Sequence, residues 1–272
     1  MTVVLAVSAM LAMPSAEALS FYPGRIVLDD EERSAVLRII NRDDVPRRYI
    51  VSWHRMRMTP ERGLRPVPED DPASELKPAR EHVLFGPRQA VVPPNSVQAV
   101  RFMAQVPADL PPGEYRSHLM ITEPPRETDL DPSKGDSDAG GVRMEIKMVN
   151  RTTMPVILRH GNPQSQVSLE DAQVRPAAER PRLDVNLGRS GASSAYLDAT
   201  VTWEAPGGER FRVFGPATLA IYPEIDHREF SHRLSLPEGR TLNGGTLHYV
   251  LRNHPLRGGS GPVLVDRRIR VP

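Results

Sequence analysis

The side chains best suited to metal chemistry are eight histidines and the carboxylates near them. The densest group is YPEIDHREFSH, which contains Glu224, Asp226, His227 and His232. Its spacing matches no common zinc pattern. In a strand, His227 and His232 would point to opposite sides. We therefore expect these residues to be solvated strand ends and expect no bound metal.

Motifs for covalent catalysis and for phosphate binding are also missing. The stretch GRSGA at 188–192 lacks the final glycine of a nucleophile elbow, so we interpret it as a turn. The sequence contains no phosphate-binding glycine loop. Nothing assembles an acid, a base and a nucleophile, so we expect a protein that is not an enzyme and needs no cofactor.

A different kind of chemistry, the binding of an apolar chain, is indicated by GVRMEIKMVNRTTMPVILRHG at 141–161. Apolar residues alternate there with charged ones, which is the pattern of a strand with two unlike faces. The apolar face consists of Val142, Met144, Ile146 and Met148. The same parity resumes at Met154 after a polar break, as if one strand served two surfaces. The alternative is that these apolar residues form the face of an ordinary strand that packs in the protein's own core.

The segment before this strand, RETDLDPSKGDSDAGG at 126–141, has no apolar period. Asp, Ser, Gly and Pro dominate it, so we predict a mobile loop. Loops of this length are uncommon in compact domains and are often functional. A loop that becomes ordered on binding would suit a neighbouring strand that serves a partner.

The composition narrows the class of protein. The 272 residues are 39% hydrophobic and 25% charged, with a formal net charge of +1, which is ordinary for a globular protein and gives no case for nucleic-acid binding. The 28 prolines and 19 glycines fit many short strands and turns. There is no cysteine, so packing alone must hold the domains together.

The N-terminus is interpreted as a signal peptide over residues 1–18. Val3 to Met13 is an apolar run of suitable length, and Ala16-Glu17-Ala18 supplies a small-x-small cleavage site, so the mature chain is expected to start near Leu19. The run is too short to span a bilayer, and no membrane insertion is expected once it is removed. The alternative is a buried N-terminal strand.

Short β-strands are expected to fill the rest of the chain. In the first half, the runs RIVLDD, SAVLRIIN, RRYIVSWHRMRM, HVLFGPRQAVVPP, SVQAVRFMAQVP and GEYRSHLMITEPP, together with the strand at 142–158, give about seven strands, the number in an immunoglobulin-like sandwich. HGNPQSQ at 160–166 is a polar turn segment suited to a domain boundary. A second series of strands follows. We predict an all-β chain with two immunoglobulin-like β-sandwich domains, 19–160 and 161–272, around an inter-domain cleft.

At this point the chain resembles the PapD-like periplasmic chaperones of pilus (fimbrial) assembly, and a divergent branch of them. Four motifs carry the resemblance in the family's order: PGRIVLDDEERSAVLRIIN, LFGPRQAVVPPNSVQAVRF, LPPGEYRSHLMI and the strand that ends in MPVILRHG. The resemblance implies a periplasmic, ATP-independent chaperone of pilus subunits. Such a chaperone lends a subunit the strand that here contains residues 142–148, which is called donor-strand complementation. It then delivers the complex to an outer-membrane usher. A dimer could cap the strand when no subunit is bound.

By the same resemblance, Val142, Met144, Ile146 and Met148 are the donor residues that fill the groove of a subunit. The family anchors the subunit's C-terminal carboxylate with an Arg and a Lys. Arg25 falls on the Arg position and can bind a carboxylate through two parallel hydrogen bonds. The Lys position falls on Pro155. Arg116 and Arg151 are the candidate substitutes, and the alternative is that both are solvated strand charges.

The rival functional hypothesis is a secreted two-domain immunoglobulin-like protein that binds a ligand or belongs to a surface structure without acting as a chaperone. The fold alone cannot separate the two hypotheses, because this sandwich hosts many functions. The strand at 142–158 discriminates between them. A chaperone should leave its even-numbered face exposed or capped in a dimer, and an ordinary sandwich should bury it.

Overall fold

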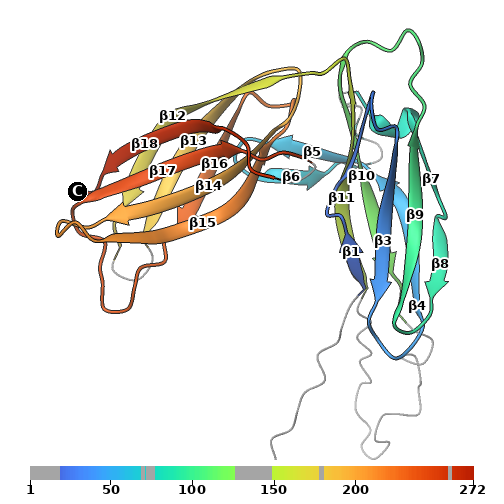
Figure 1. Cartoon of the computed structure of the whole chain (residues 1–272), viewed down its shortest axis with the longest axis horizontal. Coiled ribbons are helices and arrows are strands. Elements are labelled where there is room, and N and C mark those ends of the chain that lie inside the picture. Colours follow the sequence, from blue (N-terminus) through green and yellow to red (C-terminus); the bar gives the residue numbers. More distant parts are fainter. Residues whose placement is uncertain (1–18, 69–70, 72–76, 126–148, 178–180, 257–258) are drawn as a thin grey trace, which may run out of the picture.

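The structure is a computed structural model that describes residues 19–68, 71, 77–125, 149–177, 181–256 and 259–272. The described residues form β-strands and one 3-10 turn, η1 (Ala79–Glu81). The strands build two sandwiches that meet at one end, as Figure 1 shows. The prediction of an all-β chain with two immunoglobulin-like sandwiches is confirmed. The predicted signal peptide (1–18) and the four donor residues lie outside the described residues.

The first sandwich contains two sheets with strand orders β1-β3-β9-β7 and β2-β11-β10-β4-β8. Its strands are β1 (Ser20–Tyr22), β2 (Ile26–Asp29), β3 (Ser34–Asn41), β4 (Arg47–His54), β7 (Val83–Gly86), β8 (Gln89–Val92), β9 (Ser96–Ala104), β10 (Gly113–Glu123) and β11 (Asn150–His160). Leu37 and Phe102 of one sheet and Leu119 and Leu158 of the other are buried in the core between the sheets. A hairpin of β5 (Met56–Thr59) and β6 (Gly63–Pro66) follows β4 and extends toward the second sandwich (Figure 1).

The start of the described chain changes sheets, and this change determines which edges of the sandwich are open. β1 pairs with β3 in one sheet. After Pro23 and Gly24 the chain enters the other sheet, where β2 runs parallel to β11 and pairs with it from Val156 to Arg159. β10 pairs with β11 over its whole length, from Asn150 to His160. Among the described strands, the first half of β11 therefore has a neighbour on one side only.

The second sandwich contains sheets with strand orders β12-β13-β16 and β15-β14-β17-β18. Its strands are β12 (Ser165–Arg175), β13 (Arg182–Gly191), β14 (Ala195–Glu204), β15 (Arg210–Ile221), β16 (His227–Arg233), β17 (Thr246–Asn253) and β18 (Val263–Arg270). Trp203, Tyr249 and Leu187 are buried in its core. A side chain at Gly215, where φ is +81°, would place its Cβ 2.2 Å from the carbonyl oxygen of Ala199, so the β14–β15 bulge requires glycine there.

Where the strands differ from the sequence prediction, an interrupted period explains the difference. HVLFGPRQAVVPP forms two strands, β7 and β8, which belong to opposite sheets. The sequence analysis missed β12. A bulge between Leu169 and Asp171 shifts its register, so the apolar residues before and after the bulge do not share one parity. A search for period 2 overlooks such a strand.

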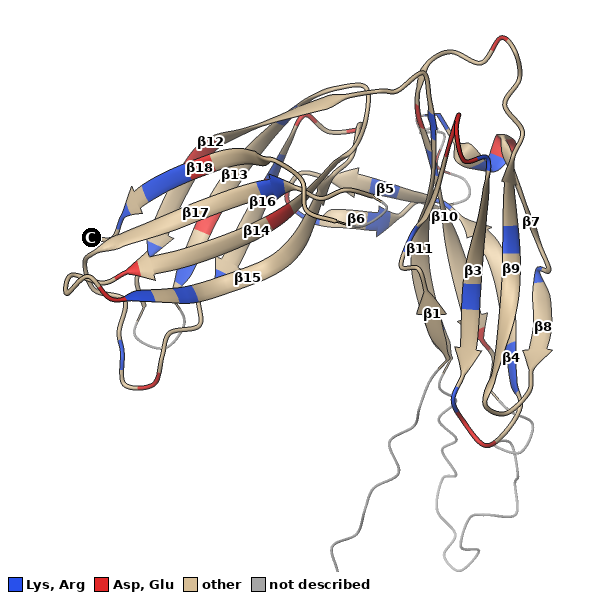
Figure 2. Cartoon of the chain, in the orientation of Figure 1, with Lys and Arg blue, Asp and Glu red and all other residues tan. Residues whose placement is uncertain are grey.

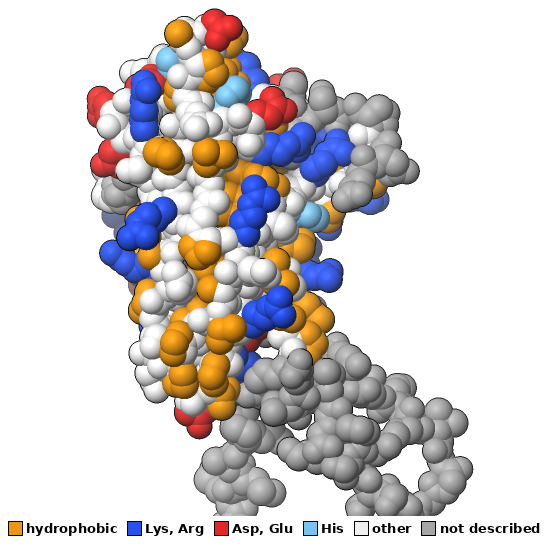
Figure 3. All heavy atoms as spheres, turned by 90° about the vertical axis from the view of Figure 1, so that its right-hand side faces the viewer, with side chains coloured by type: hydrophobic (Ala, Val, Ile, Leu, Met, Phe, Trp, Pro, Cys, Tyr) orange, Lys and Arg blue, Asp and Glu red, His pale blue; other side chains and the backbone are white. Residues whose placement is uncertain are grey.

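The described surface mixes charge and apolar residues. Lys and Arg are interspersed with Asp and Glu over both sandwiches (Figure 2). On the first sandwich, hydrophobic side chains lie among basic ones over the face drawn in Figure 3. Leu84 and Met103, which are partners on neighbouring strands, are both more than half exposed. No helix in the described part of the chain is long and apolar enough to cross a membrane.

A tyrosine corner fixes the loop that enters β10. The hydroxyl of Tyr115 donates a hydrogen bond of 2.7 Å to the carbonyl oxygen of Pro111, four residues earlier. The ring of Tyr115 is buried in the first core. A tyrosine at the start of the strand that bonds back to the preceding loop is a recurrent feature of immunoglobulin-like sandwiches.

We expect Tyr115→Phe to lower the free energy of unfolding of the first sandwich by about 1 kcal/mol, because the ring still packs but the carbonyl oxygen of Pro111 loses its donor. Urea denaturation followed by the fluorescence of Trp53, in a Trp203→Phe background, measures the change. Tyr22→Phe is the control, since the Tyr22 side chain is 62% exposed and should change stability by less than about 0.5 kcal/mol. Equal effects of the two variants would contradict the assignment.

Candidate functional site

The candidate site lies on the outer face of the five-stranded sheet, where that sheet meets the second sandwich. Side chains alternate along each strand. Tyr115 and Leu119 of β10, with Val156 and Leu158 of β11, point into the first core. The residues between them therefore point outward. Ile157 is buried all the same, because it packs on the second sandwich.

A small apolar cluster joins the two sandwiches. Met58 of the β5–β6 hairpin and Ile157 of β11 pack with Tyr196 and Tyr222 of the second sandwich. The Met58 sulfur also accepts a hydrogen bond from the backbone nitrogen of Tyr222 at 3.4 Å. The backbone nitrogen of Glu229 donates to the carbonyl oxygen of Pro60. The hairpin is therefore a direct link between the two domains.

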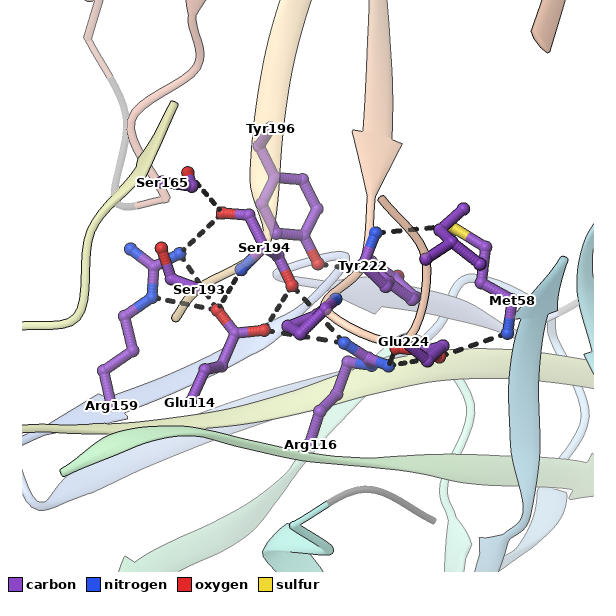
Figure 4. A network of polar contacts seen from close by, with 12 residues as sticks. Met58, Glu114, Arg116, Arg159, Ser165, Ser193, Ser194, Tyr196, Tyr222 and Glu224 are labelled. Atoms are coloured by element: carbon purple, nitrogen blue, oxygen red, sulfur yellow. Dashed lines mark hydrogen bonds and ion pairs between the residues drawn. The ribbon is translucent and has the colours of Figure 1, made fainter. Parts of the chain in front are cut away.

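A buried polar network lies beside this cluster, and Figure 4 shows its members converging from both sandwiches. The carboxylate of Glu114, whose side chain is fully buried, is its centre. It accepts hydrogen bonds from Nε and Nη2 of Arg159, each at 3.1 Å. It also accepts from the backbone nitrogen of Ser194 at 3.0 Å and from the Ser194 hydroxyl. One carboxylate thus ties two strands of the first sandwich to the second.

Arg116 completes the network. Its guanidinium donates to both carboxylate oxygens of Glu224, lies 3.7 Å above the Tyr222 ring and is 3.5 Å from a carboxylate oxygen of Glu114. Burial favours the neutral form of a guanidinium, but the charges of Glu224, Tyr222 and Glu114 outweigh this effect and the pKa of Arg116 is raised. The side chain is therefore a fixed cation at the domain junction.

A cleft of about 460 Å³ opens next to the network. Val27 and Arg159 line it from the first sandwich, and Ser193, Tyr196 and His254 line it from the second. The linker at its end is held by Asp30, which accepts hydrogen bonds from the backbone nitrogen of Gly161 at 2.8 Å and contacts the His160 ring at 2.7 Å. The predicted cleft between the domains is therefore present, and residues of both sandwiches line it.

Arg25 lies at the point where β2 begins, beside Tyr196. Its guanidinium carbon is 4.5 Å from the centre of the Tyr196 ring. Its Nη1 is buried and has no hydrogen-bond partner among the described residues. Because β2 and β11 run parallel and Ile26 pairs with Val156, Arg25 is at the level of Pro155. Arg25, just before β2, and Pro155 of β11 therefore lie at the same level on neighbouring segments.

The other two predicted anchor residues lie elsewhere on this face. Arg116 pairs with Ile157 on the neighbouring strand, and its guanidinium is taken by Glu224 and Glu114. Arg151 pairs with Thr122 near the start of β11, about 13 Å along the strand from Pro155. Arg25 and Arg116 are thus both at the domain junction, whereas Arg151 is exposed at the opposite end of the strand.

The structure adds one residue that the sequence analysis missed. His118 of β10 pairs directly with Pro155 and lies on the same outer face. The residue is 1% exposed, and its Nε2 has no hydrogen-bond partner in the described chain. Burial, together with the positive charge of Arg116 and the neighbouring His54, lowers the pKa of His118 to about 3. Its sequence context, EYRSHLM, gives no signal of this environment, because only the strand register brings it beside Pro155.

Among the described residues, no group of three or more His, Asp or Glu side chains could hold a metal ion. His227 contacts Asp226, whereas His232 is buried against the Tyr249 hydroxyl, so the expectation of solvated strand ends is wrong for His232. It is also wrong for Glu224, whose nearly buried carboxylate binds Arg116. Instead, Nη1 of Arg25 and Nε2 of His118 have no hydrogen-bond partner among the described residues, and the first half of β11 has a free edge. These groups suit the binding of an extended chain and a carboxylate.

Comparison with known proteins gives structural likenesses only. No family model and no curated protein matches the chain. The YadV chaperone is similar with 12% identity and a TM-score of 0.44, over 93% of this chain and 99% of that one. The CupB2 chaperone of Pseudomonas aeruginosa is similar with 14% identity and a TM-score of 0.44, over 91% and 97%. The CsuC–CsuE chaperone–tip subunit complex of Acinetobacter baumannii gives 12% identity and a TM-score of 0.46, over 93% and 98%. Each of these three solved structures contains a chaperone, and each is similar to this chain at low sequence identity.

We expect Glu224→Leu to lower the free energy of unfolding by about 3 kcal/mol, because it leaves Arg116 buried with one of its two carboxylates removed. The double variant Arg116→Met/Glu224→Leu should regain most of this loss, since both buried charges are then gone. Urea denaturation of the full chain measures the cycle.

The control for this cycle is Glu209→Leu. Glu209 pairs with Arg240, and both side chains are roughly half exposed, so the variant should cost less than about 1 kcal/mol. If the losses from Arg116→Met and Glu224→Leu simply add in the double variant, the two side chains do not act as a pair.

Proposed function

We propose that this protein is a periplasmic chaperone that binds and stabilises pilus (fimbrial) subunits by donor-strand complementation and delivers them for assembly at the outer membrane. The observation that carries the proposal is the open edge of β11, which β2 closes from Val156 onward. At the point of closure lies Arg25, with a buried and unpartnered guanidinium nitrogen. The family resemblance of the sequence agrees with this proposal.

The open edge can accept one more strand. It covers Asn150 to Pro155, six residues or about 20 Å. Unpaired backbone groups at such an edge bind an added strand through main-chain hydrogen bonds, with little regard to its sequence. Because Pro155 has no N–H, the last position of the edge offers only a carbonyl oxygen.

The position of β2 selects the direction of the added strand. β2 occupies the flank of β11 from Val156, so an added strand cannot extend past Pro155. A strand parallel to β11 would reach this limit with its C-terminus, beside Arg25. A guanidinium is suited to a terminal carboxylate, since the hydrogen bonds are charge-assisted and can be bidentate. We therefore propose Arg25 as the anchor of a subunit's C-terminus.

In this proposal the four donor residues bind the same subunit as the open edge. Val142, Met144, Ile146 and Met148 precede β11 and keep its parity. Four apolar side chains buried in a subunit groove at about 1.5 to 3 kcal/mol each would contribute roughly 6 to 12 kcal/mol before ordering costs are subtracted. Flexible methionines can adapt to more than one groove. In this proposal the donor segment supplies most of the affinity, and Arg25 supplies the register.

The remaining parts of the proposal follow from the family resemblance. They are the periplasmic location after removal of residues 1–18, the division at residue 160, the outer-membrane usher as the acceptor, and a dimer that caps the donor strand when no subunit is bound. Arg116, which already binds two carboxylates, is proposed to hold the domains in register. Arg151 is proposed to contact the subunit further along the edge.

The direct test is co-expression of the chain with the candidate subunit from its own operon, followed by isolation of the complex. A one-to-one complex that keeps the subunit soluble supports the proposal. A subunit that is equally soluble without the chain, and does not co-purify with it, contradicts the proposal.

We expect Ile146→Asp to abolish co-purification of the subunit, because a buried carboxylate in an apolar groove is strongly disfavoured. Lys147→Asp is the matched control, since it adds the same group at the next position, on the other face of the strand. Melting temperature checks the fold of both variants. If Ile146→Asp unfolds the protein, or if both variants lose the subunit equally, Ile146 is not a donor residue.

We expect Arg25→Ala to weaken subunit capture by about tenfold or more, the effect of losing charge-assisted hydrogen bonds, with little change in melting temperature. Arg88→Ala is the control, because Arg88 also lies over an aromatic ring, that of Phe85 at 5.3 Å, but away from the open edge. Surface plasmon resonance with the refolded subunit measures both. Unchanged capture by Arg25→Ala would remove Arg25 from the site.

A further inference from the structure

Two buried nitrogen atoms on the outer face of the sheet have no hydrogen-bond partner among the described residues, and they belong to one row of residues. They are Nη1 of Arg25 and Nε2 of His118. We propose that His118 is the second donor of the carboxylate site and acts with Arg25 on the C-terminal carboxylate of a peptide strand added to β11. This inference rests on the proposed use of the β11 edge and adds a residue that neither the sequence nor the family resemblance assigns.

The strand register places Arg25, Pro155 and His118 side by side. Pro155 pairs with His118 on one flank, and Arg25 is level with Pro155 on the other. Pro155 and His118 share the outer face, since Val156 and Leu119, which follow them in their strands, are core residues. Arg25 precedes β2, and its guanidinium lies over the Tyr196 ring of the second sandwich. Neighbouring strands are about 4.8 Å apart, so Arg25 and His118 are separated by about 10 Å at their Cα atoms.

Pro155 lies between the two bases and supplies no base of its own. Its ring is short and carries no hydrogen-bond donor. A carboxylate has two oxygen atoms that accept hydrogen bonds in different directions. Placed over Pro155, one oxygen can face the Arg25 guanidinium and the other the His118 imidazole. In this proposal, His118 on β10 supplies the base that Pro155 on β11 cannot supply.

The surroundings of His118 favour a neutral donor. Arg116, His54 and the ring of Tyr222 face the imidazole, with the centres of the Tyr222 and His118 rings 6.0 Å apart. Burial and the two basic neighbours disfavour a further positive charge and lower the pKa of His118 to about 3, so the ring is neutral near pH 7. A neutral imidazole still donates one N–H bond. The site therefore combines one charged donor with one neutral donor.

Two tyrosines of the second sandwich cover this row. Tyr196 lies over Arg25 and Tyr222 lies against His118, and their hydroxyl oxygens are 3.5 Å apart. A carboxylate that reaches His118 must move the Tyr222 ring aside. An unsatisfied nitrogen under such cover is costly, and a ligand that satisfies it recovers that cost.

The test uses the full chain and a defined probe. The probe is the acetylated peptide Thr-Val-Thr-Val-Thr with a free C-terminal carboxylate, and its C-terminal amide is the comparison. Binding is measured by NMR titration. We expect the acid to bind at least about tenfold more tightly than the amide, because both donors face the carboxylate. Equal binding of acid and amide would overturn the carboxylate site.

Variants separate His118 from its surroundings. His118→Leu should weaken binding of the acid by about tenfold and leave binding of the amide unchanged, while His118→Gln, which keeps an N–H donor, should stay within about threefold of the parent. His248→Leu is the control, since it removes a histidine of the second sandwich that contacts Asp266, away from this row, and it should have no effect. Unchanged binding by His118→Leu, or an equal loss for acid and amide, would contradict the proposal.

A second measurement covers the case in which His118→Leu does not fold. In the parent protein the acid peptide should shift the Nε2 resonance of His118, and the amide should not. A resonance that does not move on saturation with the acid overturns the proposal.

Failure of the His118 inference is distinguishable from failure of the chaperone proposal. If the chain captures a subunit but the Nε2 resonance of His118 does not respond to the acid peptide, the His118 inference fails alone. If the acid peptide binds through His118 but no subunit is captured, the chaperone proposal fails alone.

Discussion

The structure depends on one constraint, which is that β2 pairs with only the second half of β11. If residues 20–29 ran as one strand beside β11, that strand would cover the whole edge of β11 and close the sandwich there. Instead β1 belongs to the opposite sheet, and the crossing at Pro23 and Gly24 leaves the first half of β11 with β10 as its one neighbour among the described strands. Exposed edges are usually protected because they invite aggregation. An edge left open by a change of sheet therefore suggests that it has a use.

The domain junction keeps this edge next to the groups that can define its end. Glu114 draws Arg159 and Ser194 together, and Arg116 joins the first sandwich to Glu224 of the second. Buried charges add little net stability, but removing one partner is costly, so such a network favours a single domain arrangement. That arrangement places Tyr196 over Arg25 and Tyr222 against His118. The interface thus shapes the limit of the open edge.

The sequence predicts the fold well because period 2 is a local property. The runs at 182–187 and 197–204 alternate polar and apolar residues without interruption and lie in β13 and β14. The relative position of Arg25 and Pro155 could not be predicted from spacing, because it depends on the parallel register of β2 and β11. The partners of Arg116 could not be predicted, because Glu224 is more than a hundred residues away and meets it only through the packing of two domains. His118 was missed for a similar reason: its burial and its place beside Pro155 depend on register and on Tyr222.

The measurement that tests the central claim most directly is amide hydrogen exchange of β11 in the free chain and in its complex with a subunit. In the free chain, the amides from Asn150 to Met154 that point away from β10 should exchange quickly, since no described strand covers them. In the complex they should become protected, because an added strand accepts their hydrogen bonds. The edge amides of β8, Gln89 to Val92, should not change. A stable complex in which the β11 amides exchange as fast as in the free chain would contradict the account.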